Sequence, residues 1–274
     1  MSRIAEVFQS ASRAQRMTFM PFVTAGDPST EGTAAVLKAL RDADVDLIEL
    51  GFPYSDPIAD GPVIQASYTR ALDSGVTVSA ILDMMTSLKN DNLPPVLAMV
   101  SFAIIFRFGS ERFVKLAAES GFSGLIIPDL PADEAEDIQA LARANGLDLV
   151  QLVAPTTAPA RVQQILNAST GFVYCVSVAG TTGVRRELPP ELIQQLQQLR
   201  QSTSLPLAVG FGISGPDQVP ALQGVADGVI VGSAIVRQIS EAPTVQAACD
   251  RVREFSQAMR TAVGSVKPSL VSTT

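Results

Sequence analysis

The chain has no histidine and no tryptophan, and lysine is scarce in it. The few lysines lie in polar segments that are typical of helices or of the C-terminal tail: Lys38, Lys89, Lys115 and Lys267. A histidine base, a histidine-ligated metal or a buried Schiff-base lysine is therefore difficult to build here. If the protein is an enzyme, carboxylates are its strongest acid–base candidates, and we expect no metal site.

Cysteines and long apolar runs are also scarce. Cys175 and Cys249 give neither a disulfide framework nor a metal-ligand spacing. No apolar run approaches the ~20 residues that a membrane-spanning helix needs, and the N-terminus lacks the core of a signal peptide. The net charge is −7, and Lys and Arg do not cluster beyond Arg185-Arg186. These features predict a cytoplasmic protein that binds neither nucleic acid nor membrane.

Short apolar segments alternate with amphipathic segments along most of the chain. We expect a short helix over 3–13 and then eight strands, at 18–23, 46–50, 96–101, 124–128, 147–153, 172–177, 205–210 and 228–232. The helices expected after these strands cover 31–42, 63–72, 78–89, 110–119, 133–145, 159–167, 190–201, 214–222, 233–239 and 244–263. Strands that alternate with helices indicate βαβ units and a parallel sheet.

Eight such units in 274 residues favour a closed (β/α)8 TIM barrel over an open doubly wound sheet. We expect one α/β domain over residues 1–266, with the first helix capping the bottom of the barrel. The second and eighth βα units are each expected to hold an extra helix. The tail 267–274 is expected to be frayed.

The stretch 46–62 holds two acidic residues of special interest. Glu49 lies inside an apolar strand, where a charge is costly to bury unless it is paired or kept for chemistry. A structural carboxylate bonded by backbone donors is the alternative. Strand alternation lets Glu49 point into the barrel near its mouth, where desolvation should raise its pKa towards neutrality. Asp60 follows on a Pro- and Gly-rich loop and should stay ionised. Asp27 and Asp129, also near strand ends, are as well explained as loop caps.

Three glycine-rich loops follow the last three strands, at 179–183, 210–214 and 231–234. Glycines let backbone N–H groups approach a ligand, and a helix N-terminus adds a positive dipole end. Singly, each loop could be an ordinary turn. Together, in the part of the barrel where phosphates commonly bind, they predict a phosphate site. Ser214 and Asp217 have the spacing of a capping box for the next helix.

Several of these motifs resemble those of the tryptophan synthase alpha subunit family, a family of (β/α)8 barrels. The matching segments span nearly the whole chain: 21–28, 49–62, 127–131, 154–157, 180–183, 210–214 and 231–234. The segment 49–62 is the most specific of them, because glycine loops occur in many phosphate-binding barrels. The resemblance implies a lyase of tryptophan biosynthesis that cleaves indole-3-glycerol phosphate to indole and glyceraldehyde 3-phosphate by a retro-aldol step.

The resemblance also implies roles for individual residues. Glu49 would be the acid/base, Asp60 would hold the indole N–H, and Tyr174 would help to place them. Residues that would hold the phosphate are Gly183, Gly212, Gly232 and Ser233. Phe22 and Phe211 would line the indole pocket, although ordinary core packing explains them as well. The loops 55–61 and 178–190, with Asp56 and Thr182, resemble the family's lids.

The family implies a partner, a beta subunit in an αββα heterotetramer that receives the indole. Pyridoxal phosphate belongs to that partner, so no cofactor is expected in this chain. Two features depart from the family pattern. The segment 100–106 lacks the Asn-Pro that many members carry, and position 178 is Val where some have Arg. Three alternatives therefore stay open: a weakly catalytic regulatory subunit that activates the beta chain, a free-standing lyase that releases indole, and another phosphate-binding barrel enzyme.

Overall fold

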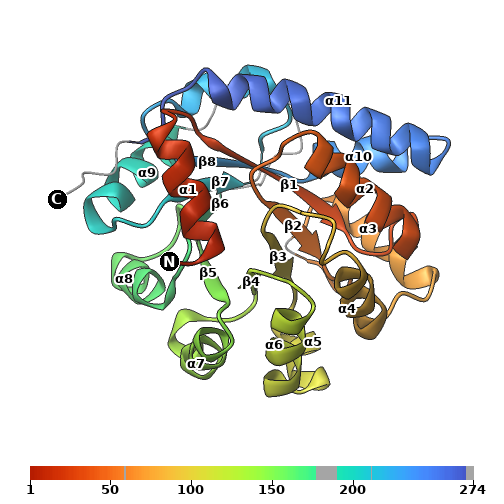
Figure 1. The fold of residues 1–274 in the computed structure, drawn as a ribbon. Coiled ribbons are helices and arrows are strands. Elements are labelled where there is room, and N and C mark those ends of the chain that lie inside the picture. The colour runs from red at the N-terminus through yellow and green to blue at the C-terminus, as the bar shows by residue number, and fades with distance from the viewer. Residues whose placement is uncertain (59, 177–189, 211, 270–274) are drawn as a thin grey trace.

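The computed structural model describes residues 1–58, 60–176, 190–210 and 212–269. Eight parallel strands close into a barrel in sequence order, with β1 pairing to both β2 and β8 (Figure 1). The strands are β1 Thr18–Thr24, β2 Ile48–Gly51, β3 Val96–Met99, β4 Gly124–Ile126, β5 Asp148–Val153, β6 Val173–Val176, β7 Leu207–Gly210 and β8 Gly228–Val231. The predicted (β/α)8 barrel is confirmed.

Helices surround this barrel in the order expected from the sequence (Figure 1). They are α1 Arg3–Arg13, α2 Thr30–Asp42, α3 Pro62–Asp73, α4 Val78–Ser87, α5 Phe102–Phe108, α6 Ser110–Glu119, η1 Ala132–Glu134, α7 Glu136–Ala144, α8 Pro159–Ala168, α9 Pro190–Ser202, η2 Pro216–Leu222, α10 Ser233–Ser240 and α11 Val245–Gly264. Hydroxyl caps begin several of them: Ser29 accepts from Gly32 N and Thr244 from Ala247 N. The expected extra helices are α3 and the pair α10 and α11.

Two connections differ from the prediction. The segment after β3 forms a short helix, α5, which begins where Ser101 caps Ala103 N. The connection after β7 is a 3₁₀ helix, η2, rather than an α-helix, and it contains Pro220. Proline lacks the N–H that an α-helical ladder needs, so the tighter turn replaces it.

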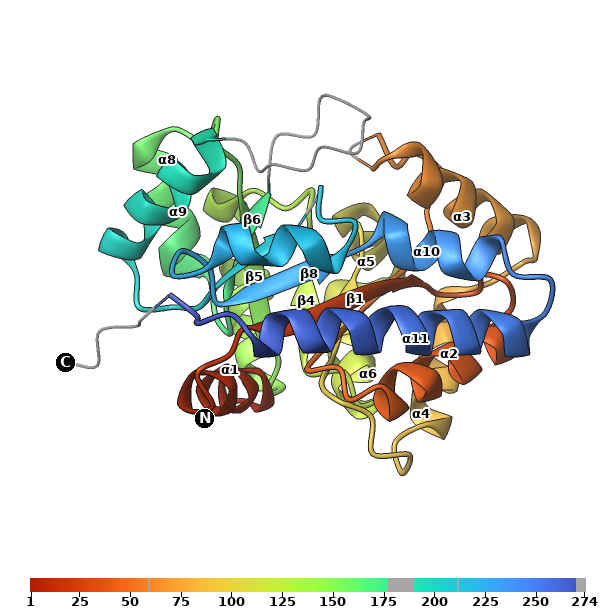
Figure 2. The same cartoon turned by 90° about the horizontal axis from the view of Figure 1, so that it is seen from above.

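The N-terminal helix closes the bottom of the barrel, as predicted. Ile4 and Phe8 of α1 belong to the same apolar cluster as the inward side chains of the strands. A Cβ at Gly124 would lie 3.0 Å from Ile4, and one at Gly228 would lie 3.2 Å from Phe8. Glycines at the starts of β4 and β8 therefore make the room that α1 fills, at the end of the barrel away from the loop before α3 (Figure 2).

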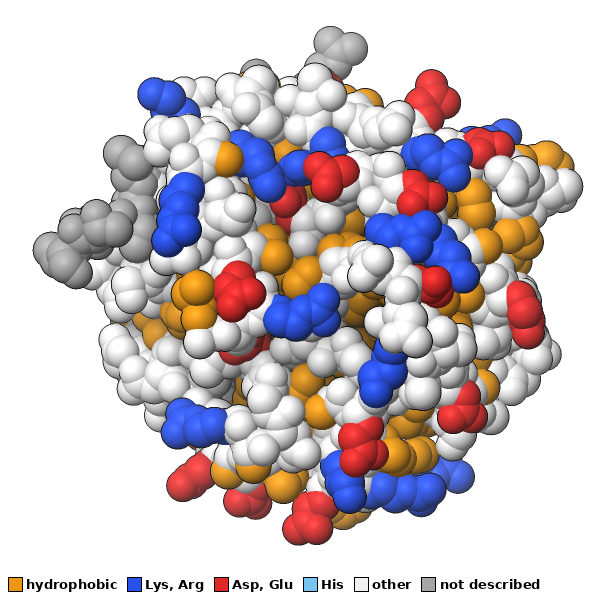
Figure 3. All heavy atoms as spheres, viewed as in Figure 1, with side chains coloured by type: hydrophobic (Ala, Val, Ile, Leu, Met, Phe, Trp, Pro, Cys, Tyr) orange, Lys and Arg blue, Asp and Glu red, His pale blue; other side chains and the backbone are white. Residues whose placement is uncertain are grey.

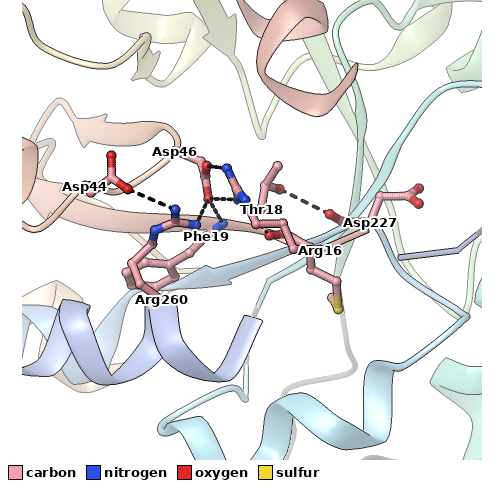
Figure 4. A network of polar contacts seen from close by, with 8 residues as sticks. Arg16, Thr18, Phe19, Asp44, Asp46, Asp227 and Arg260 are labelled. Atoms are coloured by element: carbon pink, nitrogen blue, oxygen red, sulfur yellow. Dashed lines mark hydrogen bonds and ion pairs between the residues drawn. The ribbon is translucent and has the colours of Figure 1, made fainter. Parts of the chain in front are cut away.

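Ion pairs fix the strand starts at this same end. Asp46, just before β2, accepts from Phe19 N at 2.9 Å and pairs with Arg16 and Arg260, each at 2.8 Å (Figure 4). Arg260 comes from α11, so one carboxylate joins the first strand, the second strand and the last helix. Asp227, just before β8, pairs with Arg200 of α9.

The tail is ordered further than predicted. Ser269 N donates to Ala226 O at 2.9 Å, and Arg200 Nε donates to Ser269 Oγ at 3.0 Å. The expected fraying is therefore wrong for residues 267–269, because these hydrogen bonds hold them against the barrel; residues 270–274 lie outside the described part of the chain.

Acidic and basic side chains are interspersed on the face that carries α1, and neither sign dominates it (Figure 3). Within the described ranges, none of the helices is both long enough and apolar enough to cross a membrane.

Candidate active site

Glu49 points into the barrel from β2. Its neighbour Leu47 belongs to the interior cluster, whereas Ile48 and Leu50 pack outward against the helices. The Glu49 side chain is 0% exposed, and neither carboxylate oxygen has a hydrogen-bond partner among the described residues. Burial raises the pKa of Glu49 to about 8, in the direction expected from the sequence. Protonated and ionised forms therefore coexist near neutral pH, which suits a group that gives and takes a proton.

Asp60 lies in the loop that leads into α3, and a glutamine holds this loop. Gln65 Nε2 donates to Asp60 O at 2.7 Å and to Pro57 O at 3.1 Å. Burial raises the pKa of Asp60 to about 6, so its carboxylate is mostly ionised at pH 7. Sequence reasoning missed Gln65, because a glutamine on an amphipathic helix gives no signal that it faces back to its own N-terminal loop.

Tyr174 lies on β6 with its side chain inside the barrel. It is 3% exposed, and its ring and hydroxyl occupy the space that a Cβ at Gly210 would fill. Burial raises the pKa of Tyr174, and the negative charges of Glu49 and Asp60 raise it further. The hydroxyl therefore stays protonated and can donate a hydrogen bond. The structure thus brings Glu49, Asp60 and Tyr174 together at one end of the barrel.

Phe22, on β1, packs inside the same end. Its ring covers the space over Gly51, and its Cβ would lie 3.8 Å from a Cβ at Gly232. Phe22 therefore lies between the strand that carries Glu49 and the loop that follows β8. Phe211, the other predicted wall of the indole pocket, lies outside the described residues.

Two of the three predicted phosphate loops are described. Gly212 has φ +85°, a conformation that favours glycine. Gly232 precedes α10, which starts at Ser233 without a side-chain cap, so N–H groups of its first turn remain for an anion. Gly183 and Thr182 lie outside the described residues, as does Val178.

A second glutamine holds the Gly212 loop. Gln218 Oε1 accepts from Ser214 N at 2.7 Å and from Ser214 Oγ at 3.0 Å, while its Nε2 donates to Gly212 O at 3.0 Å. The expected capping box of Ser214 and Asp217 is wrong, because the side chain of Gln218 takes the place that Asp217 was expected to fill. No side chain caps η2.

The remaining acids near the strand ends have structural partners. Asp129 accepts from Phe102 N at 2.7 Å and from Ser101 Oγ at 2.6 Å, which makes it a cap for α5, as one reading of the sequence had it. Asp27 instead forms a bidentate ion pair with Arg70 on α3 and accepts from Ser67. The predicted lid residue Asp56 is exposed and accepts from Ser55 Oγ at 2.9 Å.

Among the described residues, no group of three or more His, Cys, Asp or Glu side chains is placed to hold a metal ion. The polar groups that the described residues place at this end of the barrel are carboxylates, tyrosine hydroxyls and backbone N–H groups. That set fits a proton-transfer reaction on a phosphorylated substrate.

Comparison with known proteins identifies the family. A family profile described as tryptophan synthase alpha chain matches residues 8–264. This chain belongs to the tryptophan synthase alpha chain family. The chain is 44% identical to the tryptophan synthase alpha chain of Rhodopirellula baltica, over 96% of this chain and 99% of that one. It is 49% identical to that of Prochlorococcus marinus strain MIT 9313, over 87% of each chain.

Solved structures agree. The crystal structure of tryptophan synthase subunit alpha from Legionella pneumophila superposes with a TM-score of 0.88 at 34% identity, over 97% of this chain and 100% of that one. The chain is accordingly a carbon–carbon lyase, the tryptophan synthase alpha subunit that cleaves indole-3-glycerol phosphate. In this family, pyridoxal phosphate belongs to the beta subunit.

Proposed function

We propose that Glu49 is the acid/base of this cleavage and that Asp60 and Tyr174 assist it. The observation that carries the proposal is the buried Glu49 carboxyl, which has no hydrogen-bond partner among the described residues and a pKa raised to about 8. A buried carboxyl without a structural partner is costly, so its retention is best explained by its chemistry.

The proposed reaction starts with protonated Glu49. Its proton passes to C3 of the indole ring, which places positive charge on the ring nitrogen, and Asp60 accepts a hydrogen bond from that N–H. The Glu49 carboxylate then takes the proton of the hydroxyl on the carbon attached to C3. A carbonyl forms at that carbon, the carbon–carbon bond breaks, and its electron pair returns to the ring. One proton enters and one leaves, so Glu49 ends as it began.

The phosphate end of the substrate is proposed to lie at Gly212, Gly232 and Ser233, with Gly183 completing the site. The glycine backbone lets N–H groups approach the phosphate closely, and α10 directs its N-terminus to it. Phe22 is proposed to line the indole pocket between this anchor and Glu49. Asp56 and Thr182 are proposed to belong to lids that exclude water when they close. No cofactor or metal takes part in these steps.

The deciding experiment is the turnover of indole-3-glycerol phosphate by Glu49→Gln. Glutamine keeps the shape of the side chain but can neither donate nor accept the catalytic proton, so cleavage should fall by at least about a thousandfold. Glu119→Gln, at an exposed position of α6, is the matched control and should keep full activity. Turnover by Glu49→Gln close to that of the unmodified chain would rule out the proposed role.

We further propose that a beta subunit docks beside the barrel mouth, in an αββα assembly in the cytoplasm. Two large apolar side chains are exposed on the loop after β2 and on α5: Ile58 is 89% exposed and Phe106 is 73% exposed. The strands that precede these two segments, β2 and β3, are neighbours in the barrel, and exposed apolar side chains can mark a protein interface. The altered segment 100–106 thus still offers an apolar contact, as α5.

Phe106→Ser tests this docking surface. Loss of one exposed aromatic anchor should weaken binding of a beta subunit about tenfold or more, while turnover by the isolated chain stays the same. Leu72→Ser, on the exposed side of α3, is the control. Unchanged beta-subunit affinity would place the interface elsewhere. Negligible turnover by the isolated chain that appears only with the beta subunit would favour the regulatory alternative, and good turnover without complex formation would favour the free-standing lyase.

A further inference from the structure

The chain has three tyrosines, and all three lie around the acid pair. Tyr174 is placed beside Glu49 by β6. The other two, Tyr54 and Tyr68, pack ring to ring at 5.5 Å between centroids, and burial raises the pKa of both, with the charge of Asp60 adding to it. Tyr54 is half-buried, whereas Tyr68 is 2% exposed. The proposed reaction uses only Tyr174, so Tyr68 is a buried polar group without an assigned task.

The position of the Tyr68 hydroxyl follows from the glycine that it covers. The hydroxyl lies 2.9 Å from the place where a Cβ at Gly51 would stand. Gly51 is two residues after Glu49 on β2, so both face the barrel interior. Two strand residues span roughly 6.6 Å, and therefore the hydroxyl lies about one such step towards the mouth from Glu49.

Neighbouring aromatic rings fix the ring of Tyr68, whereas its hydroxyl is left without a hydrogen-bond partner among the described residues. Tyr54 packs on one side of the ring, and Phe22 meets the same space over Gly51. The structure shows no hydrogen bond from the Tyr68 hydroxyl to another of the described residues. The hydroxyl is not among the fully enclosed polar atoms that lack a partner, so a polar atom of a ligand at the mouth can reach it and accept its hydrogen bond.

We propose that Tyr68 is a further substrate-contacting residue, whose hydroxyl donates a hydrogen bond to a hydroxyl of the glycerol chain. This inference rests on the proposed function, in which Glu49 acts at the carbon that joins the indole to that chain. The phosphate anchor at Gly232 and the acid at Glu49 hold the two ends of the chain. Tyr68, on the mouth side of Glu49, reaches the hydroxyl-bearing carbons between them. Its role is selection of a hydroxylated chain.

The test compares two ligands that differ only in these hydroxyls. Binding is measured by calorimetry in the Glu49→Gln background, so that the substrate stays intact. One ligand is indole-3-glycerol phosphate, and the other is indole-3-propanol phosphate, which joins the same indole and phosphate by a chain without hydroxyls. Tyr68→Phe should weaken binding of the first about tenfold, the worth of one buried hydrogen bond, and change binding of the second by less than twofold.

Tyr54→Phe is the matched control, since it removes a hydroxyl from the other ring of the same pair and should leave both affinities within twofold. Equal weakening of both ligands by Tyr68→Phe would mean that the residue only packs, and unchanged binding of both would mean that it makes no contact; either result overturns the inference. If Glu49→Gln still cleaves the substrate, the proposed function itself fails. If Glu49→Gln abolishes cleavage but Tyr68→Phe does not distinguish the two ligands, only the inference about Tyr68 fails.

Discussion

Asp46 and Asp227 at the bottom of the barrel and Glu49 at its mouth are buried carboxyl groups with opposite surroundings. At the bottom, Asp46 has two arginines and a backbone N–H as partners, and Asp227 has Arg200 and Leu207 N. At the mouth, Glu49 is fully buried, and its oxygens have no partner among the described residues. Paired carboxylates thus hold the strands in place at the bottom, whereas the carboxyl group at the mouth is left without a partner, which is why we propose a chemical role for it.

This contrast has a cost in stability at the mouth. Breaking a pair at the bottom should destabilise the protein, because a charge is left without its partner. Removing the charge at the mouth should stabilise it, because an unfavourable burial is relieved. Three substitutions compare the strand-holding residues at the bottom with the residues around the acid pair at the mouth, in order of their expected effect on stability.

Asp46→Asn should lower the free energy of unfolding by about 3 kcal/mol, because Arg16 loses its charged partner and Arg260 keeps only the exposed Asp44. Urea unfolding at pH 7 measures this loss. The control is Asp250→Asn, since its pair with Arg253 is exposed and contributes less than about 0.5 kcal/mol. Turnover of the folded variant should stay within twofold. An equal loss of stability in Asp46→Asn and Asp250→Asn would show that the buried pairs at the bottom contribute no more than an exposed pair.

Gly210→Ala should lower stability by about 2 kcal/mol and turnover at least tenfold, because the new methyl group would occupy the place of the Tyr174 ring and hydroxyl. Gly264→Ala, at the end of α11, is the control, since a Cβ there meets nothing within 4 Å. Thermal unfolding and steady-state cleavage measure both effects. Normal turnover in Gly210→Ala would show that the position of Tyr174 is unimportant.

Gln65→Ala should change stability by less than about 1 kcal/mol and yet lower kcat several-fold, because the loop of Asp60 loses the two hydrogen bonds that fix it. Gln139→Ala, whose amide bonds an exposed carbonyl on α8, is a suitable control. Parallel kcat and unfolding measurements separate the two effects. A loss of stability as large as that of Asp46→Asn would assign Gln65 to the scaffold.

The sequence predicted the architecture of the barrel better than it predicted the side-chain contacts. The eight βα units and the inward direction of Glu49 follow from apolar alternation, which depends only on local pattern. The 3₁₀ helix η2 was not anticipated, since Pro220 opposes the α-helix that the local pattern favoured. The helix α5 was not anticipated either, since Asp129, which caps it, lies far along the chain. Gln65, Gln218 and Tyr68 were missed because each lies on a helical segment, and only the fold shows which loop or strand end it faces.

The measurement that tests the central claim most directly is the stability of the unmodified chain and of Glu49→Gln as a function of pH. With a pKa of about 8 in the folded state and 4.5 as its ordinary value, Glu49 keeps its proton in the folded chain but loses it in the unfolded chain between these values. Unfolding therefore becomes easier as pH rises from 4.5 to 8, and the penalty is complete above pH 8. Glu49→Gln should therefore gain on the order of 5 kcal/mol in stability over the unmodified chain across this window. A stability difference that stays flat from pH 4.5 to 9 would contradict it.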